Sequence, residues 1–317
     1  MSAAPRTAPF YIVLNVGSGH GDSDEAQTAI GNVLTEAGQP HEFFLAKNTD
    51  DISTIAQRAV VTAQKNNGIV IAAGGDGTIN AVAQAVLDGN VPFGVLPQGT
   101  FNYFGRTHAI PTDTVGATRA LLNATLQPAQ VGLLNDRVFL VNASIGLYPQ
   151  LLEDRETYKQ KFGRFRLVAL WSGLATLLRG YPQLRLSIER DGKKTPLRTP
   201  TFFVGNNALQ LQQIGIPEAD AQPRGFLVAV TPQPVSRWSM LGLIFRGARG
   251  KLGEANAVNS FAFKEAVVRL QFQSQRRIKV ATDGEVLWME TPLSFRVSPQ
   301  PLQLLIPADS DKVVEQP

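Results

Sequence analysis

The sequence IVIAAGGDGT, residues 69–78, decides how the first part of this chain folds. Its apolar run is rich in β-branched residues and follows Asn-Asn-Gly, so it predicts a buried strand. Apolar residues then recur at helical spacing up to Val86. A Gly-Asp-Gly turn also suits a hairpin, but a hairpin requires a second strand, and here a helix follows. The order strand, glycine turn, helix lets helix amides point at a bound anion, which predicts a phosphate-binding site.

The same alternation of strand and helix patterns extends from residue 10 to residue 122. Repeated units of this kind with continuously apolar strands predict a parallel sheet that is covered by helices on both faces. Ligands of such sheets bind at the carboxyl ends of the strands, where the glycine turn lies. The predicted strands are 10–14, 42–46, 69–73 and 93–97, and the helices between and after them are 26–37, 52–63 and a segment that starts at Thr112 or Asp113.

From residue 138 the pattern changes to strand-like runs that are separated by Pro and Gly, which predicts a mostly antiparallel sandwich or barrel. Two helical patterns interrupt this region, near residues 159–178 and 236–245. The strand-like runs are 138–143, 184–189, 201–205, 226–230, 267–272, 278–281 and 293–297.

Composition excludes several classes of protein. The chain has no Cys, which excludes disulfides and thiolate sites, and its three His residues lack metal-ligand spacing. It has no signal-peptide pattern at its start and no run of about 18 apolar residues that could span a membrane. The net charge of +4 is mild, and aromatic residues do not alternate with Lys and Arg, which argues against nucleic-acid binding. We therefore expect a soluble, cytoplasmic protein.

Two further polar turns carry candidate functional groups. The turn PQGTFNYFGR, residues 97–106, follows another predicted strand, so Thr100 and Asn102 can face the same ligand as Asp76. Polar turns are common, but two glycine turns at neighbouring strand ends favour a site. The turn TDGE, residues 282–285, offers two carboxylates that could act as a general base and a metal ligand. It could equally form a type I′ hairpin turn, which the spacing alone favours.

The chain resembles the diacylglycerol kinase catalytic-domain family in three motifs that occur in the same order, namely GGDGT, the GTFN at residues 99–102 and the final DGE. That family includes bacterial soluble lipid kinases and is related to sphingosine and ceramide kinases. The resemblance runs from Phe10 to Pro307 and includes residues 142–146 and 206–207. It implies an active site in the cleft between two domains. These are a Rossmann-like α/β domain, residues 8–135 with 300–308 returning to it, and a β-sandwich lipid-substrate domain, residues 136–299.

The resemblance also implies an ATP-dependent lipid kinase that transfers the γ-phosphoryl group of Mg-ATP to the hydroxyl of a diacylglycerol-like membrane lipid. Phosphoryl transfer needs positioned phosphates, Mg²⁺ to neutralise charge and a base near the acceptor oxygen. By resemblance, Asp283 and Glu285 are catalytic, Asp283 as the base, while Asp76 and Glu285 approach the metal. The implied nucleotide contacts are Asn15, Ser18, Gly19, Gly74, Gly75, Asp76, Gly77, Thr78, Gly99, Thr100 and Asn102.

The chain departs from the family pattern at Val16, which stands where the family often has Pro, and at three positions where the family carries acids. Those three positions are Tyr103, Tyr148 and Arg224. The resemblance therefore leaves open whether a second, structural Mg²⁺ site exists. The acids assigned to the reaction are all retained.

Residues 155–178 and 238–251 each combine a cationic cluster with an apolar, Trp-containing run. This composition is typical of helices that lie on an anionic membrane surface, although a core helix with solvated charges has the same pattern. In a lipid kinase the pair favours membrane contact by at least one of them. We therefore expect peripheral association with the inner face of the membrane.

Two alternatives remain open. A NAD kinase-like phosphotransferase also uses GGDGT, but Asn206-Asn207 lacks the acid of the usual Asn-Glu pair in such enzymes. A non-catalytic nucleotide- or lipid-binding protein of the same fold is the other alternative, and the retained acids argue against it. The sequence leaves open the lipid, the choice of ATP or GTP, and the oligomeric state, with a homodimer as one alternative.

Overall fold

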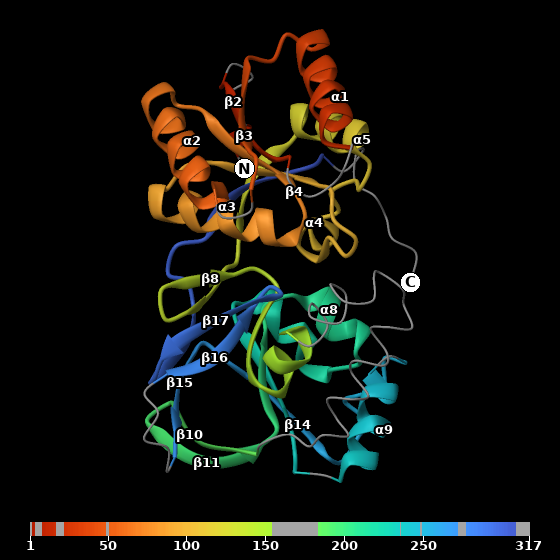
Figure 1. Ribbon diagram of the computed structural model, residues 1–317, viewed down its shortest axis with the longest axis vertical. Coiled ribbons are helices and arrows are strands. Elements are labelled where there is room, and N and C mark those ends of the chain that lie inside the picture. The colour runs from red at the N-terminus through yellow and green to blue at the C-terminus, as the bar shows by residue number, and fades with distance from the viewer. Residues whose placement is uncertain are drawn as a thin grey trace. The chain divides into compact units, whose positions relative to one another are not determined.

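The computed structural model divides into two compact units, residues 1–131 with 299–317 and residues 132–298 (Figure 1). Two predicted features, Ser18-Gly19 and the basic apolar segment at 155–178, lie outside the residues that the structure describes. In those residues no helix is both long and apolar enough to cross a membrane. The described residues are 2–3, 8–16, 22–48, 51–153, 183–234, 236–247, 249–271 and 277–308.

The first unit is built on a seven-stranded sheet with the order β1-β6-β19-β5-β4-β2-β3. Strands β19, β5, β4, β2 and β3 are parallel, which confirms the predicted parallel sheet, and β6 and β1 extend one edge in antiparallel pairing. The strands are β1 (Ser2–Ala3), β2 (Phe10–Asn15), β3 (His41–Ala46), β4 (Ile69–Gly74), β5 (Phe93–Pro97), β6 (Thr125–Ala129) and β19 (Leu302–Ile306).

Helices cover both faces of this sheet, with α2 and α3 together on one face and α1 and α5 together on the other (Figure 1). Small residues let α2 and α3 pack closely, because a Cβ on Gly89 would lie 2.3 Å from the Val60 side chain. Asp113 caps α5 by accepting a 2.6 Å hydrogen bond from the Gly116 amide, as the sequence predicts. The helices are α1 (Asp22–Glu36), α2 (Ile52–Asn66), α3 (Asp76–Gly89), α4 (Tyr103–Thr107) and α5 (Thr114–Leu122).

The second unit contains two six-stranded antiparallel sheets, ordered β11-β10-β15-β18-β7-β8 and β14-β13-β12-β9-β16-β17, which confirms the predicted antiparallel β region. Side chains from both sheets form one buried core, in which Phe202 meets Phe295 edge to face at 5.5 Å. The strands are β7 (Gly132–Leu134), β8 (Arg137–Phe139), β9 (Asn142–Gly146), β10 (Leu184–Arg190), β11 (Lys193–Thr199), β12 (Thr201–Gly205), β13 (Leu227–Pro232), β14 (Val258–Phe263), β15 (Glu265–Leu270), β16 (Arg277–Thr282), β17 (Glu285–Glu290) and β18 (Leu293–Val297).

The prediction of one continuous strand over residues 138–143 was wrong. The chain leaves the first sheet after Phe139 and enters the second at Asn142, so residues 140 and 141 cross from one sheet to the other. Every residue of the crossing is apolar and buried, which is why its sequence looks like a strand. The helical elements of this unit include α8 (Ala208–Gln213), the 3₁₀ helix η2 (Pro217–Arg224) and α9 (Arg237–Gly247), and residues 147–153 are helical as well.

Candidate functional site

The two predicted glycine turns of the first unit lie side by side at the carboxyl ends of β4 and β5. Gly74 pairs with Pro97 in the sheet, and the Gln98 amide donates a 2.8 Å hydrogen bond to the Gly74 carbonyl. A Cβ on Gly99 would come within 3.0 Å of the Gly75 Cα, so the close approach of the two turns depends on Gly99 having no side chain. The helix α3 starts at Asp76, directly after the first turn. Its free N-terminal amides therefore lie at the edge of the sheet where ligands bind.

Asn15 and Thr78 meet beneath the first glycine turn. The Asn15 Nδ2 donates a 3.2 Å hydrogen bond to the Thr78 Oγ1, and both residues are buried. The Thr78 side chain also fills the space where a Cβ of Gly74 would lie, at 2.7 Å. The structure thus brings together three of the predicted nucleotide contacts. It gives the two side chains a role in fixing the shape of the turn.

Asp76 is the acid of this turn and opens the first turn of α3. Its Oδ2 accepts a 3.1 Å hydrogen bond from the Asn102 amide, and the Tyr103 amide also bonds to the carboxylate. Its Oδ1 is buried and has no hydrogen-bond partner among the described residues. Burial raises the pKa of Asp76 above 3.8, and the two amide bonds offset only part of that effect. A buried carboxylate oxygen without a partner is suited to a cation, because burial without compensation is costly.

Asn102 closes the second glycine turn on itself. Its Oδ1 accepts a hydrogen bond from the Gly99 amide and its Nδ2 donates one to the Gly99 carbonyl, both at 2.9 Å. The residue is buried and has a left-handed backbone with a φ of 49°, which Asn tolerates well. Its side chain therefore holds the turn, whereas Thr100 is exposed and free to meet a ligand.

An aromatic surface on the same turn was not predicted from the sequence. The rings of Phe101 and Tyr103 are stacked, with centroids 5.9 Å apart and an interplanar angle of 3°, and Phe101 is 48% exposed. The Arg106 guanidinium lies 5.9 Å from the Tyr103 ring centroid. A flat exposed ring beside a glycine turn is able to stack on a nucleobase. The sequence signal that could have indicated this surface is the presence of two aromatic residues inside a polar turn.

In the second unit, Asp283 and Gly284 form the two-residue turn between β16 and β17. Their φ values are 47° and 92°, and Thr282 pairs with Glu285, so the hairpin interpretation is confirmed. The Asp283 carboxylate accepts hydrogen bonds from the amides of three consecutive residues, Leu140 at 2.6 Å, Val141 at 2.9 Å and Asn142 at 2.8 Å. The turn therefore ties the crossing between the sheets to the β16–β17 hairpin.

Glu285 is held from a different direction. Its Oε2 lies 2.7 Å from an Nη of Arg137, and the two side chains are 42% and 40% exposed. The Arg137 Nε is buried without a partner among the described residues. Arg137 was not predicted from the sequence, because 148 residues separate it from Glu285 and no motif contains it.

The middle segments that the resemblance includes lie around the same crossing. The Asn206 Nδ2 donates a 3.0 Å hydrogen bond to the Leu140 carbonyl, and the Asn142 Nδ2 donates a 3.1 Å bond to the Gln210 Oε1. The Asn142 Oδ1 and the Ser144 Oγ are buried and have no partner in the described part of the chain. A polar cluster thus surrounds the segment that Asp283 holds. Among the described residues no three His, Cys, Asp or Glu side chains are grouped to hold a metal ion.

Comparison with known proteins agrees with these motifs. Residues 9–134 match the model of the diacylglycerol kinase catalytic domain. The chain is 24% identical to an uncharacterized protein of Synechocystis over 96% of its own length and 72% of that protein. It is 30% identical over 180 residues to a diacylglycerol kinase of Staphylococcus aureus, and this match spans only 54% of each chain. The resemblance predicted from the sequence is confirmed.

Solved structures share the fold over both units. Two structures from Bacillus anthracis, named for diacylglycerol kinases, have TM-scores of 0.70 and 0.67 with this chain at 20% sequence identity. Each match covers 96% of this chain, and 98% or 97% of the other. At this identity the likeness concerns the fold, which confirms an α/β domain followed by an antiparallel β region.

Proposed function

We propose that this protein is a lipid kinase that transfers the γ-phosphoryl group of Mg-ATP to the hydroxyl of a diacylglycerol-like membrane lipid. The match of residues 9–134 to the diacylglycerol kinase catalytic-domain model supports this proposal. The observation that carries the proposal is the buried, unpartnered Oδ1 of Asp76 at the start of α3, beside two adjoining glycine turns. Exposed helix amides bind phosphates, and a free carboxylate oxygen binds the accompanying cation.

The first unit would bind the nucleotide. The phosphates would lie against the backbone of the two turns at Gly74, Gly75 and Gly99 and against the first amides of α3. Asp76 and Glu285 are the residues that would hold Mg²⁺, and Asp76 fits this role because its Oδ1 has no hydrogen-bond partner in the described part of the chain. When bound, the metal neutralises charge that develops on the phosphates. Phe101 would offer its exposed ring to the base.

The second unit would supply the base. Three backbone amides bind the carboxylate of Asp283, which would accept the proton of the lipid hydroxyl. The amides fix the orientation of the carboxylate and at the same time compete with the incoming proton. Glu285 would exchange its contact with Arg137 for the metal, which is feasible because the ion pair is about 40% exposed.

Turnover of labelled ATP against a panel of lipids in mixed micelles tests the proposal. We expect transfer to a lipid hydroxyl, strongest with diacylglycerol, and none to NAD. GTP replaces ATP in a parallel series, and Mg²⁺ is removed by chelation in another. Transfer to NAD instead of any lipid, or no transfer to any acceptor by folded protein that binds Mg-ATP, contradicts the proposal.

Glu285→Gln should lower turnover at least about tenfold, which equals about 1.4 kcal/mol of activation free energy. The same change should alter the free energy of unfolding by less than about 1 kcal/mol, since half-exposed ion pairs contribute that little. Kinetics at several Mg²⁺ concentrations and urea unfolding give the two values. Glu290→Gln, at the exposed end of the same strand, is the matched control and should change neither. Full turnover in Glu285→Gln would remove Glu285 from the site.

We also infer that α9 contacts an anionic membrane surface at the inner face of the membrane. The Phe245 side chain is 61% exposed, which argues against a core role for this residue, and the Arg249 guanidinium lies 3.5 Å from its ring centroid. Arg246 and Lys251 are exposed nearby. A stacked cation and ring place apolar and positive groups together at one surface, as interfacial helices do.

Replacing Arg246, Arg249 and Lys251 by Gln should reduce co-sedimentation with anionic vesicles, and added salt should mimic this loss. Each cation near such a surface contributes about 1 kcal/mol, screened over about 8 Å at physiological salt. Phe245→Ala should weaken binding with little dependence on salt. Leu45→Ala, which truncates an exposed apolar side chain of β3, is the control. Unchanged vesicle binding by both α9 variants would place the membrane contact elsewhere.

A further inference from the structure

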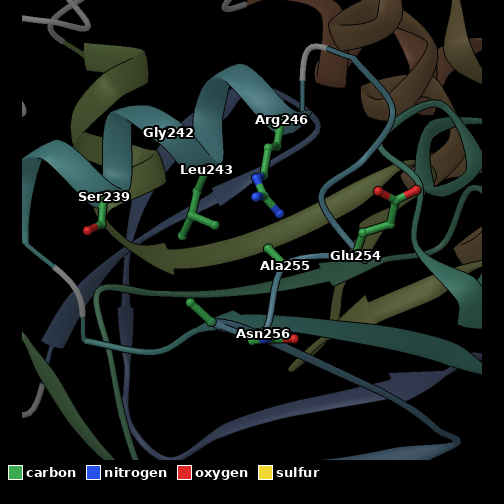
Figure 2. A pocket seen from close by; sticks show the side chains of 8 residues that line it. Ser239, Gly242, Leu243, Arg246, Glu254, Ala255 and Asn256 are labelled. Atoms are coloured by element: carbon green, nitrogen blue, oxygen red, sulfur yellow. The ribbon is translucent and has the colours of Figure 1, made fainter.

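A groove of about 460 Å³ runs between α9 and the segment 254–257 (Figure 2). Leu243 and Ala255 are almost fully buried beneath it and belong to the small cluster that packs α9 onto the rest of the unit. A Cβ on Gly242 would meet no atom within 4 Å, so the missing side chain leaves the groove open. The groove is lined by Ser239, Gly242, Leu243, Arg246, Glu254, Ala255, Asn256 and Ala257.

The two walls of the groove carry opposite charges. Figure 2 shows the Arg246 side chain reaching from α9 toward the segment that carries Glu254. Both residues are exposed, and within the described ranges neither forms an ion pair, although oppositely charged neighbours commonly do so. Both charges are therefore available to a ligand that is itself dipolar, with its anionic group at Arg246 and its cationic group at Glu254.

We propose that this groove binds the headgroup of a zwitterionic membrane phospholipid that carries a primary ammonium group, as phosphoethanolamine does. The phosphate would meet the Arg246 guanidinium, and the ammonium would donate hydrogen bonds to the Glu254 carboxylate. None of the eight lining residues is aromatic, and quaternary ammonium groups are recognised by aromatic rings, so a choline headgroup fits less well. Phe245, exposed on the same helix, would enter the acyl region of the bilayer. The inference rests on the membrane contact inferred above for α9.

Co-sedimentation with two vesicle types of equal net charge tests the proposal. Both contain the same fraction of anionic lipid. The remainder is phosphatidylcholine in one type, and in the other a fixed fraction of that phosphatidylcholine is replaced by phosphatidylethanolamine. We expect the wild type to bind the second type about fivefold more strongly, the effect of one charged contact at a membrane surface. Glu254→Gln should abolish this preference, and Arg246→Gln should reduce binding to both types. Glu265→Gln and Arg198→Gln are exposed controls on other strands and should keep the preference.

Gly242→Leu provides a variant that fills the groove without removing a charge. The Cβ position is open, and Leu is a better helix former than Gly, so the variant should fold at least as well as the wild type. It should lose the phosphatidylethanolamine preference. An NMR titration with glycerophosphoethanolamine shows whether the free headgroup suffices, and amide shifts at residues 242–257 are expected. Retained preference in both Glu254→Gln and Gly242→Leu, or no preference in the wild type, overturns the proposal.

Turnover of a short-chain soluble lipid separates this proposal from that of the enzyme activity. If the groove is wrongly assigned, the wild type still phosphorylates the soluble lipid but shows no headgroup preference. If the kinase proposal is wrong, the headgroup preference remains and turnover is absent.

Discussion

Asp283→Asn is expected to lower turnover by about 10²–10⁴ and to destabilise the second unit in the same step. The first effect follows because an amide cannot accept the lipid proton. The second follows because the Asn side chain has only one oxygen, so its NH₂ group would face a backbone amide that now bonds to the carboxylate. An unsatisfied buried amide costs about 1–3 kcal/mol. Labelled-ATP turnover below the unfolding transition and urea unfolding measure the two effects separately.

Asp191→Asn is a closely matched control for this change. Asp191 and Gly192 form the turn between β10 and β11 with φ values of 51° and 73°, and here too both are positive. The Asp191 side chain is 87% exposed, and no backbone amide of the described residues donates a hydrogen bond to it. The control variant should keep both stability and turnover. Normal turnover in a destabilised Asp283→Asn protein would show that Asp283 holds the crossing and takes no part in the chemistry.

Asp76→Asn is expected to weaken Mg-nucleotide binding at least about tenfold, or about 1.4 kcal/mol, without lowering the stability of the fold. The charge that the nucleotide metal would require is lost, while the Asn side-chain oxygen can still accept the Asn102 amide. Isothermal titration with Mg-ATP gives the affinity. Asp88→Asn, at an exposed position of the same helix, should bind normally. Equal affinities of Asp76→Asn and wild type would remove Asp76 from the nucleotide site.

The pH dependence of stability checks the same residue without any ligand. Because burial raises the pKa of Asp76 in the folded state above 3.8, the folded state binds this proton more tightly than the unfolded state. The contribution of Asp76 to the free energy of unfolding is therefore fully present below pH 3.8 and is lost as the pH rises through the raised pKa. Asp76→Asn should be more stable than wild type at neutral pH, and the difference should shrink as the pH falls toward 3.8. A variant less stable than wild type at neutral pH would contradict the raised pKa.

Much of the first unit could be predicted because its signals are local. Strands β2, β4 and β5 are buried along their whole length, so each appears as an apolar run, and the glycine turn after β4 lies directly between its strand and its helix. Strand β11 lacks such a signal. It is mostly exposed, contains Pro196 and forms by pairing with β10, so its sequence looks like a loop.

For the predicted site residues, the sequence likewise indicated local features but not contacts made through the tertiary fold. Asp283 was identified as an acid in a turn, but its three amide partners lie more than 140 residues earlier in the chain and could not be inferred from spacing. Arg137 could not be inferred from spacing either, because it lies on β8 in one sheet and its partner Glu285 lies on β17 in the other. The role of Asn102 could not be predicted either, since an Asn that closes a turn and an Asn that binds a ligand have the same sequence pattern. Contacts made through the tertiary fold supplied each of these findings.

Strand β19 has a consequence for how the protein is made. It pairs with β5 on one side and β6 on the other, inside the sheet of the first unit, although it comes last in sequence among the described strands. Domains usually fold in order as they leave the ribosome. Here the second unit, residues 132–298, is fully synthesised before residues 302–306 emerge. The unit that begins first is therefore completed last, and a ribosome that stalls before Leu302 would release a chain with a finished β-domain and an open, unpaired sheet edge.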